Sequence, residues 1–332
     1  MAGLVAAARA RELGAEAVVY EKGTRAGGSM LLSSGFIWRY RSVETHLEQC
    51  PGADPGLAAT IVEQFDDALD WLESLGVELV TRETGNPLTV GARFDPRQLV
   101  EVLARDVRLG ETADEPTILA TGGFPARLAR ERGLLLRANP WSEGDGLDLA
   151  LTRGAATAGE LDEFYGRNMP DADELAEEDF VRASQLYARY AHVVDDHGNE
   201  ILPMPFSWSE SDVAQATARQ PNGRAWYLLT EKALRQQVRD RTVADMVDYA
   251  DPVPAEHLPF VVPHSIVVGV RVRAAVTHTT GGIKIDVRAG VVGVDGLFAA
   301  GVDAGGWSTG GFAGGLGPAL VLGRIAAESA LG

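Results

Sequence analysis

Apolar side chains recur every three or four residues in two segments, which is the spacing of one face of an α-helix. In residues 3–13 these side chains are Leu4, Ala7, Ala8 and Leu13. In residues 55–75 they are Ile61, Phe65, Leu69, Leu72 and Leu75. A third helix is predicted to begin at Pro96, because Asp95 suits an N-cap and proline suits the first helical position.

Three segments are rich in β-branched residues and predict buried strands. They are AVVYE at 17–21, TILATGGF at 117–124 and SIVVGVRVRAAV at 265–276. The first of these strands closes on Glu21, and the second ends in a pair of glycines. The pattern therefore indicates a protein that mixes helices and strands.

Glycine is the informative excess in the composition. The chain has 38 glycines in 332 residues, about 11%, against roughly 7% in average proteins. Many of them lie in KGTRAGGSMLLSSG (22–35), TILATGGF, DGLFAAGVDAGG (295–306) and GGFAGGLGPAL (310–320). Turns of this kind expose backbone N–H groups and let the chain approach a ligand closely, so we expect them to line a binding site.

The amino-terminal segment fits part of a dinucleotide-binding motif. Gly3 occupies the place of the third glycine, which lets the helix pack on a strand, and Glu21 follows at the distance of the acid that holds the ribose hydroxyls. The first strand and first two glycines of that motif do not occur, and an ordinary helix–strand pair remains the alternative. The later glycine turns favour the binding motif.

Residues 155–260 differ from the rest, with acidic runs, many aromatic residues and few glycines. We therefore predict a discontinuous nucleotide-binding domain, 1–154 and 265–332, interrupted by a second domain at 155–264.

The net charge disfavours some classes of binding partner, and the single cysteine excludes some kinds of site. The formal net charge of −17 disfavours nucleic acid and anionic membranes. Cys50 alone excludes an internal disulfide and any multi-cysteine metal site, and no metal site is predicted. No stretch reaches the roughly 20 apolar residues of a membrane span, and no export signal is recognised, so we expect a cytoplasmic protein.

Together these motifs resemble the FAD-dependent family that contains fumarate reductase and succinate dehydrogenase flavoprotein subunits and 3-oxosteroid dehydrogenases. The resemblance runs through AGLVAAARARELGAEAVVYEKGTRAGGS, ILATGGF, EGDGLDLALTRGA, THTTGGIKID and GLFAAGVDAGG…GGFAGGLGPAL. It implies an α/β fold, with a Rossmann-like FAD-binding domain interrupted by an α+β capping domain over the substrate. A small β-meander that the family carries before ILATGGF is absent.

The resemblance implies FAD as cofactor and assigns the residues around it. Glu21 would hold the adenosine ribose, and the glycine turns would lie near the pyrophosphate and the flavin. Asp145 would lie beside the cofactor, although it also suits the N-cap of a helix. The implied binding residues are Gly3, Glu21, Lys22, Gly27, Gly28, Ser29, Ser33, Ser34, Gly35, Ala120, Thr121, Gly122, Asp145, Gly301, Val302, Asp303, Gly315 and Leu316. Because MLLSSGF lacks the histidine that carries covalent flavin in succinate dehydrogenases, we expect the FAD to be noncovalent.

The family chemistry moves a hydride and a proton across a carbon–carbon bond beside a carbonyl or carboxylate. His278, in THTTGG, is the expected ligand of that oxygen; a structural histidine is the alternative. Candidates for handling the proton are Tyr165, Tyr187 and Arg189, and Tyr165 suits a core aromatic equally well.

The predicted function is an FAD-dependent dehydrogenase or reductase acting on CH–CH groups of a small, mostly apolar molecule. A second arginine that the family carries near the last glycine loop is missing around Gly311, which disfavours a dicarboxylate held by two arginines. The electron acceptor is unknown. The alternative is a non-catalytic relic of the flavoprotein fold that binds a ligand or partner. A disulfide or NAD(P)H reductase is disfavoured, since there is no cysteine pair and no second dinucleotide motif.

Overall fold

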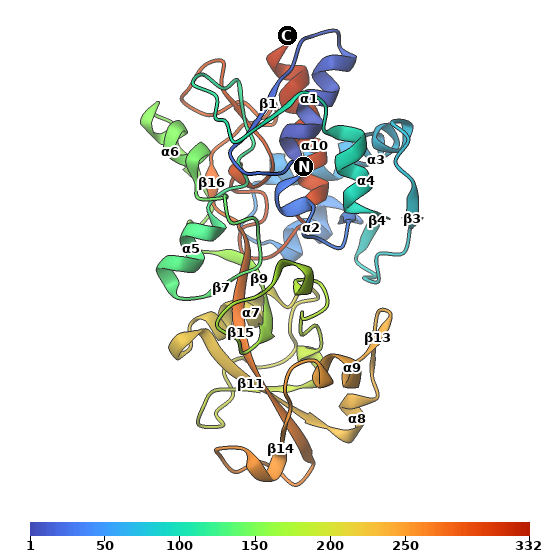
Figure 1. Cartoon of the computed structure of the whole chain (residues 1–332), viewed down its shortest axis with the longest axis vertical. Helices are drawn as coiled ribbons and strands as arrows, with labels where there is room; N and C mark the ends of the chain where they lie inside the picture. The colour runs from blue at the N-terminus through green and yellow to red at the C-terminus, as the bar shows by residue number, and fades with distance from the viewer. The chain divides into compact units, whose positions relative to one another are not determined.

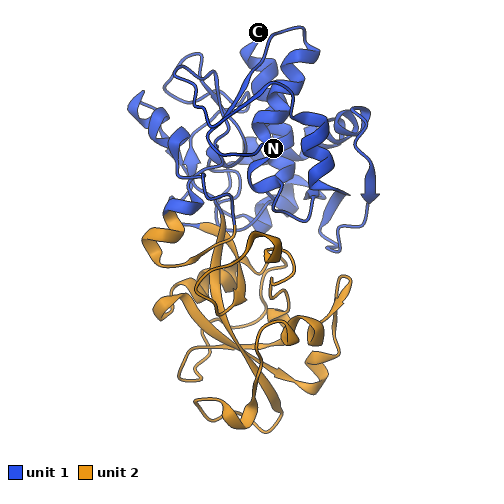
Figure 2. Cartoon of the chain, in the orientation of Figure 1, with its two compact units in different colours: residues 1–127, 138–163, 278–332 blue, residues 128–137, 164–277 orange.

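A computed structural model describes residues 1–332 (Figure 1). The chain divides into two units (Figure 2). Unit 1 comprises Met1–Arg127, Ala138–Glu163 and His278–Gly332, and unit 2 comprises Leu128–Arg137 and Phe164–Thr277. None of the helices combines the length and the apolar character that crossing a bilayer requires.

Unit 1 contains most of the helices, and its C-terminal helix α10 packs against α1 and α3. The helices of unit 1 are α1 (Ala2–Glu12), α2 (Val43–Gln49), α3 (Pro55–Ser74), α4 (Pro96–Leu103), α6 (Asp145–Thr152) and α10 (Leu316–Ala330). Helix α5 (Pro125–Arg132) starts in unit 1 and ends in unit 2. The close packing of α1 on α10 requires Gly323, because a Cβ there would lie 2.7 Å from the carbonyl oxygen of Ala2.

The predicted helices are confirmed, and their termini follow from their caps. The side chain of Asp54 accepts a hydrogen bond from Leu57 N at the start of α3, and Asp95 accepts one from Arg97 N at the start of α4. The apolar face of α3 is buried as its spacing predicts, with Phe65 and Leu72 fully enclosed.

The strands of unit 1 form short sheets. Two pairs are parallel: β1 (Val19–Glu21) with β5 (Val107–Leu109), and β6 (Ile118–Leu119) with β17 (Phe298–Ala299). Strands β2 (Phe36–Tyr40), β4 (Thr89–Phe94) and β3 (Leu79–Thr81) form an antiparallel sheet, and β8 (Thr157–Ala158) pairs with β16 (Gly282–Ile283). The parallel pairs hold the segments predicted to meet the dinucleotide.

The strand predicted at 117–124 is shorter than its composition indicated. Only Ile118–Leu119 pairs as β6, because Gly122 and Gly123 adopt left-handed backbone angles, φ 92° and 69°, that end the extended conformation. The strand predicted at 265–276 is instead longer and continues to Thr279 as β15 (Ile266–Thr279). His278 therefore lies on a strand rather than in a loop.

Unit 2 is built on an antiparallel sheet of order β10-β11-β15-β14, with β7 and β9 also paired to β15. Its strands are β7 (Leu135–Leu136), β9 (Phe164–Pro170), β10 (His192–Val194), β11 (Arg224–Thr230), β14 (Val253–Pro254) and β15, with a small hairpin of β12 (Gln237–Val238) and β13 (Arg241–Thr242). Its helices are α7 (Ser211–Ala218), α8 (Glu231–Leu234) and α9 (Val243–Asp248). Its largest apolar core gathers Tyr187, Tyr227, Met246, Val270 and Val272. Most of the predicted cap lies in unit 2, and its role over a substrate stays a prediction.

Candidate functional site

The end of β1 carries the predicted ribose ligand. Glu21 is the last residue of the strand, and its Oε1 accepts a hydrogen bond from Gly23 N at 2.8 Å. Gly3 lies close to the turn after β6, because a Cβ on it would be 3.3 Å from the Cβ of Ala120. Helix α1 and the ends of these strands thus converge as a dinucleotide fold requires.

The ends of β6 and β17 are joined by Asp303. Its carboxylate accepts hydrogen bonds from Thr121 N, from Thr121 Oγ1 at 2.9 Å and from Gly123 N at 3.0 Å. Only 1% of Asp303 is exposed, and this burial raises the pKa of its carboxyl group although the three donors oppose the rise. Gly301 lies in the same turn and has φ 68°. A Cβ on Gly301 would lie 3.0 Å from the Cβ of Ala2.

The turn at 27–35 is held together by its serines. Ser29 Oγ accepts a hydrogen bond from Asn139 N at 3.0 Å, and Ser33 Oγ donates to Met30 O at 2.7 Å. Gly35 has φ 75°, and a Cβ there would meet the carbonyl oxygen of Phe94. Gly27 and Gly28 also adopt left-handed angles, and the carbonyl group of Ser34 accepts a hydrogen bond from Arg93.

Segment 138–146 lies over these turns, and the sequence reasoning assigned only its Asp145. The indole ring of Trp141 packs against Gly23, where a Cβ would be 2.3 Å from the ring. Ser142 Oγ is likewise 2.7 Å from the place of a Cβ on Gly122. The N-cap of α6 is Gly144, so Asp145 is the first helical residue and forms an ion pair with Lys22 at 2.5 Å.

His278 lies in an aromatic environment near the start of α10. It is 6% exposed, and its ring centroid is 6.0 Å from that of Trp307 and 5.4 Å from that of Phe312. Its Nδ1 is 3.3 Å from the place of a Cβ on Gly315, the residue before Leu316 at the start of α10. Burial lowers the pKa of His278 to about 3, so the imidazole is neutral at pH 7.

Glu163 was not predicted, yet it ties the segment of His278 to the last glycine loop. Its carboxylate accepts hydrogen bonds from Thr280 Oγ1 and from Gly310 N, both at 3.0 Å. Nothing in its local sequence distinguishes it from a surface acid, because both partners are more than 100 residues away in the chain.

Unit 2 contains the other three candidates. Tyr187 is fully buried, donates its hydroxyl hydrogen to Gln185 Oε1 at 2.6 Å and packs on Tyr227; burial raises its pKa well above the usual value. Arg189 donates to the carbonyl group of Trp208 at 3.1 Å. Tyr165 is 7% exposed on β9. Their roles with the proton stay predictions.

The residues of unit 1 fit FAD at its two ends. In a dinucleotide fold a carboxylate at the end of a parallel strand binds the ribose hydroxyls, and Glu21 is such a carboxylate at the end of β1. No side chain caps the first N–H groups of α10, so this helix end suits the negative charge of a reduced flavin. Between these ends, Gly23 and Gly122 are covered by the protein's own segment 138–146.

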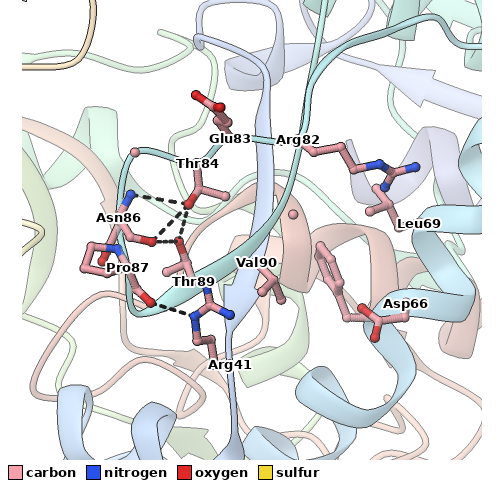
Figure 3. Close-up of a pocket in the computed structure, with 13 residues that line it drawn as sticks. Arg41, Asp66, Leu69, Arg82, Glu83, Thr84, Asn86, Pro87, Thr89 and Val90 are labelled. Carbon is pink, nitrogen blue, oxygen red and sulfur yellow. Dashed lines mark hydrogen bonds between the residues drawn. The ribbon is translucent and has the colours of Figure 1, made fainter.

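A separate pocket of about 620 Å³ lies against the β3–β4 hairpin (Figure 3). Its lining includes Arg41, Asp66, Arg82, Glu83, Thr84 and Asn86. Arg41 Nε donates to the carbonyl oxygen of Pro87 at 2.6 Å. None of the predicted site residues lines this pocket.

Solved structures with the same fold include several flavoproteins. The open conformation of a flavocytochrome c3 fumarate reductase is 21% identical with TM-score 0.68, over 100% of this chain and 77% of that one. The 3-ketosteroid-Δ4-(5α)-dehydrogenase of Rhodococcus jostii RHA1, in complex with 4-androstene-3,17-dione, is 19% identical with TM-score 0.74, over 100% and 95%. The 3-ketosteroid Δ1-dehydrogenase of Sterolibacterium denitrificans, in complex with 1,4-androstadiene-3,17-dione, is 14% identical with TM-score 0.69, over 99% and 98%.

The family comparison covers most of the sequence. No curated protein matches the chain. The family model described as "FAD binding domain" matches residues 1–114 and 100–317, and the two matches overlap just before β6. The predicted α/β flavoprotein fold and the FAD cofactor are confirmed, and the chain belongs to the FAD-binding domain family.

Proposed function

We propose that the protein is an FAD-dependent oxidoreductase that acts on a CH–CH bond beside a carbonyl or carboxylate of a small, mostly apolar molecule. Membership of the FAD-binding domain family supports the cofactor. Relatives of the same fold are named as a fumarate reductase and 3-ketosteroid dehydrogenases, which act on bonds of this type. When bound, the FAD supplies the acceptor or donor of the hydride.

The observation that carries the proposal is the position of His278. Its imidazole lies beside Gly315, at the helix end that suits a flavin, and it is enclosed by Trp307 and Phe312. With its pKa lowered to about 3, His278 stays neutral and acts as a hydrogen-bond donor to the substrate oxygen rather than as an acid. The aromatic rings keep water away from the polarised oxygen.

The proton is assigned to a residue of unit 2. Tyr165 and Arg189 are the stronger candidates, because the hydroxyl group of Tyr187 is buried in the core and donates its hydrogen to Gln185. Tyr165 lies under the guanidinium group of Arg167, at 5.2 Å from ring centroid to Cζ.

The visible spectrum of the protein as isolated is the first test, because bound FAD gives absorption bands that apoprotein lacks. Anaerobic reduction or reoxidation of the flavin by a panel of saturated and α,β-unsaturated ketones and acids is the second. We expect at least one of these ketones or acids to reduce or reoxidise the flavin. His278→Ala is expected to slow this exchange about 10²-fold without releasing FAD, since alanine has no hydrogen-bond donor to polarise the substrate oxygen.

A second candidate function is a flavoprotein relic that binds a ligand or partner without turnover. The contacts of Trp141 with Gly23 and of Ser142 with Gly122 favour it, because they close the middle of the cofactor site. FAD that binds, yet exchanges electrons with no organic compound, would support this candidate over the enzyme.

A further inference from the structure

Residues 138–146 form a strap that lies across the turns assigned to the cofactor. The N–H of Asn139 donates a hydrogen bond to Ser29 Oγ at 3.0 Å. The indole ring of Trp141 packs on Gly23, where a Cβ would lie 2.3 Å from the ring. The strap therefore touches both the turn that follows the predicted ribose ligand and the glycine turn predicted to lie near the pyrophosphate.

The other end of the strap covers the turn after β6. Ser142 Oγ donates a hydrogen bond to Thr121 O at 3.3 Å, and it lies 2.7 Å from the place of a Cβ on Gly122. Asp145 forms its ion pair with Lys22 at 2.5 Å, and the two side chains are 49% and 37% exposed. The strap and all of its partners in these contacts belong to unit 1.

The ring of Trp141 fills the space that a ligand of this turn requires. Gly23 N donates to Glu21 Oε1 at 2.8 Å, so the turn lies directly beside the carboxylate predicted to hold the ribose. A glycine turn lets a ligand approach the backbone, yet here not even a methyl group fits between Gly23 and the indole ring. A dinucleotide can therefore reach the backbone of Gly23 only if the ring moves away.

The middle of the strap is held less firmly than its ends. Trp141 is only partly buried, and the guanidinium group of Arg25 lies 5.9 Å from the centre of its ring. At one end of the strap Ala138 is 1% exposed, and at the other end the chain enters α6 through its N-cap Gly144, whose φ is 97°. A glycine at the end of an element absorbs the change of backbone angles that a hinge requires.

We propose that the strap is a gate for the cofactor, which covers the turn at Gly23 and swings away from it before FAD binds. A diphosphate offers Lys22 the negative charge that Asp145 supplies in the closed strap, so this contact is exchanged rather than lost. Because only the open form binds FAD, the closed strap lowers the apparent affinity by the fraction of molecules that are open. The inference concerns the loading of the cofactor and does not rest on the proposed reaction.

Titration of the full-length apoprotein with FAD, followed by flavin fluorescence, tests the gate. Trp141→Ala removes the ring that fills the turn, so we expect it to bind FAD about tenfold more tightly than the wild type. Trp208→Ala is the matched control and is expected to leave the affinity unchanged, because Trp208 is 42% exposed and has the guanidinium group of Arg189 at 4.2 Å from its ring. An unchanged or lowered affinity of a folded Trp141→Ala protein, judged by circular dichroism, overturns the proposal.

A disulfide staple tests the movement itself. Ser142 Cβ lies 3.5 Å from the place of a Cβ on Gly122, within the separation of about 3.5–4.5 Å that a disulfide spans, and the native Cys50 is fully buried. In the protein with Gly122→Cys and Ser142→Cys, we expect oxidation to lower the affinity for FAD at least about tenfold and dithiothreitol to restore it. The reduced form controls for the two substitutions themselves. An oxidised protein that binds FAD as tightly as its reduced form overturns the proposal, whether or not the flavin is redox-active.

Discussion

Asp303 and Thr121 join the ends of two parallel strands that are distant in the sequence. The carboxylate of Asp303, after β17, accepts hydrogen bonds from both the N–H and the hydroxyl of Thr121, after β6. The predicted glycine turns at 120–122 and 301–303 are thereby brought together in unit 1, and the carboxylate is held where it cannot reach water.

Asp303→Asn is expected to destabilise the protein by about 2–3 kcal/mol. The amide keeps one acceptor oxygen but places an NH2 group against the N–H of Thr121, and the buried donor then has no acceptor. Urea denaturation measures the loss. Asp148→Asn is the matched control, because Asp148 is exposed and its ion pair with Arg127 contributes little; an equal loss in both variants contradicts the prediction.

Stability is expected to fall as the pH is lowered through the range from about 6.5 to 3. His278 has a folded pKa of about 3 and an unfolded pKa of about 6.5. Between these two pH values the imidazole is protonated in the unfolded state and neutral in the folded state. Its contribution is present in full above pH 6.5 and declines by about 2–3 kcal/mol by pH 4.5.

The difference between the wild type and His278→Gln isolates this residue from His46, whose pKa is also lowered by burial. Urea denaturation at pH 7 and at pH 4.5 measures it. The variant is expected to lose less stability between the two pH values, and equal losses would show that His278 is not desolvated.

The helices and the glycine turns could be predicted because their signals are local. Asp54 and Asp95 cap helices whose first residues follow them directly, and the apolar spacing of α3 repeats along its 20 residues. The extent of β6 could not be predicted, since the composition of 117–124 is that of a strand, and the left-handed angles of Gly122 and Gly123 end the extended conformation. Local pattern fixes where an element exists better than where it stops.

The candidate site was predictable only where each residue lies in a motif. Glu21 and Gly3 come from one helix–strand unit: Glu21 is the last residue of β1, and Gly3 lies near Ala120 after β6. Their contacts with the cofactor stay predictions. Glu163 and Trp141 were not predicted, because they contact Thr280 and Gly23, which are distant from them in the chain. Pairings of this kind depend on tertiary packing and leave no signal in the neighbouring sequence.

Gly23→Ala is expected to destabilise the protein by about 1–3 kcal/mol, because the new methyl group would lie 2.3 Å from the ring of Trp141. The same substitution in a Trp141→Ala background is expected to cost much less, since the ring it meets is gone. Thermal unfolding of the four proteins of this double-mutant cycle gives the coupling energy. Additive losses would mean that Trp141 does not pack on the turn after Glu21.

Glu163→Ala is expected to lower the stability by about 1–3 kcal/mol and to slow the proposed reaction, because Thr280 Oγ1 and Gly310 N lose their shared acceptor. Glu163→Gln keeps one oxygen that accepts, so we expect it to recover more than half of both losses.

Glu163 acts through position: it holds the segment of His278 against the loop before α10 and touches no reacting atom in this scheme. The affinity for FAD, measured by titration of apoprotein, should therefore change less than twofold, while kcat falls about tenfold with little change in KM. A variant that loses FAD in step with activity would show that Glu163 supports the cofactor site as a whole, and a Glu163→Gln protein as impaired as Glu163→Ala would show that its charge, rather than its hydrogen bonds, holds the two segments together.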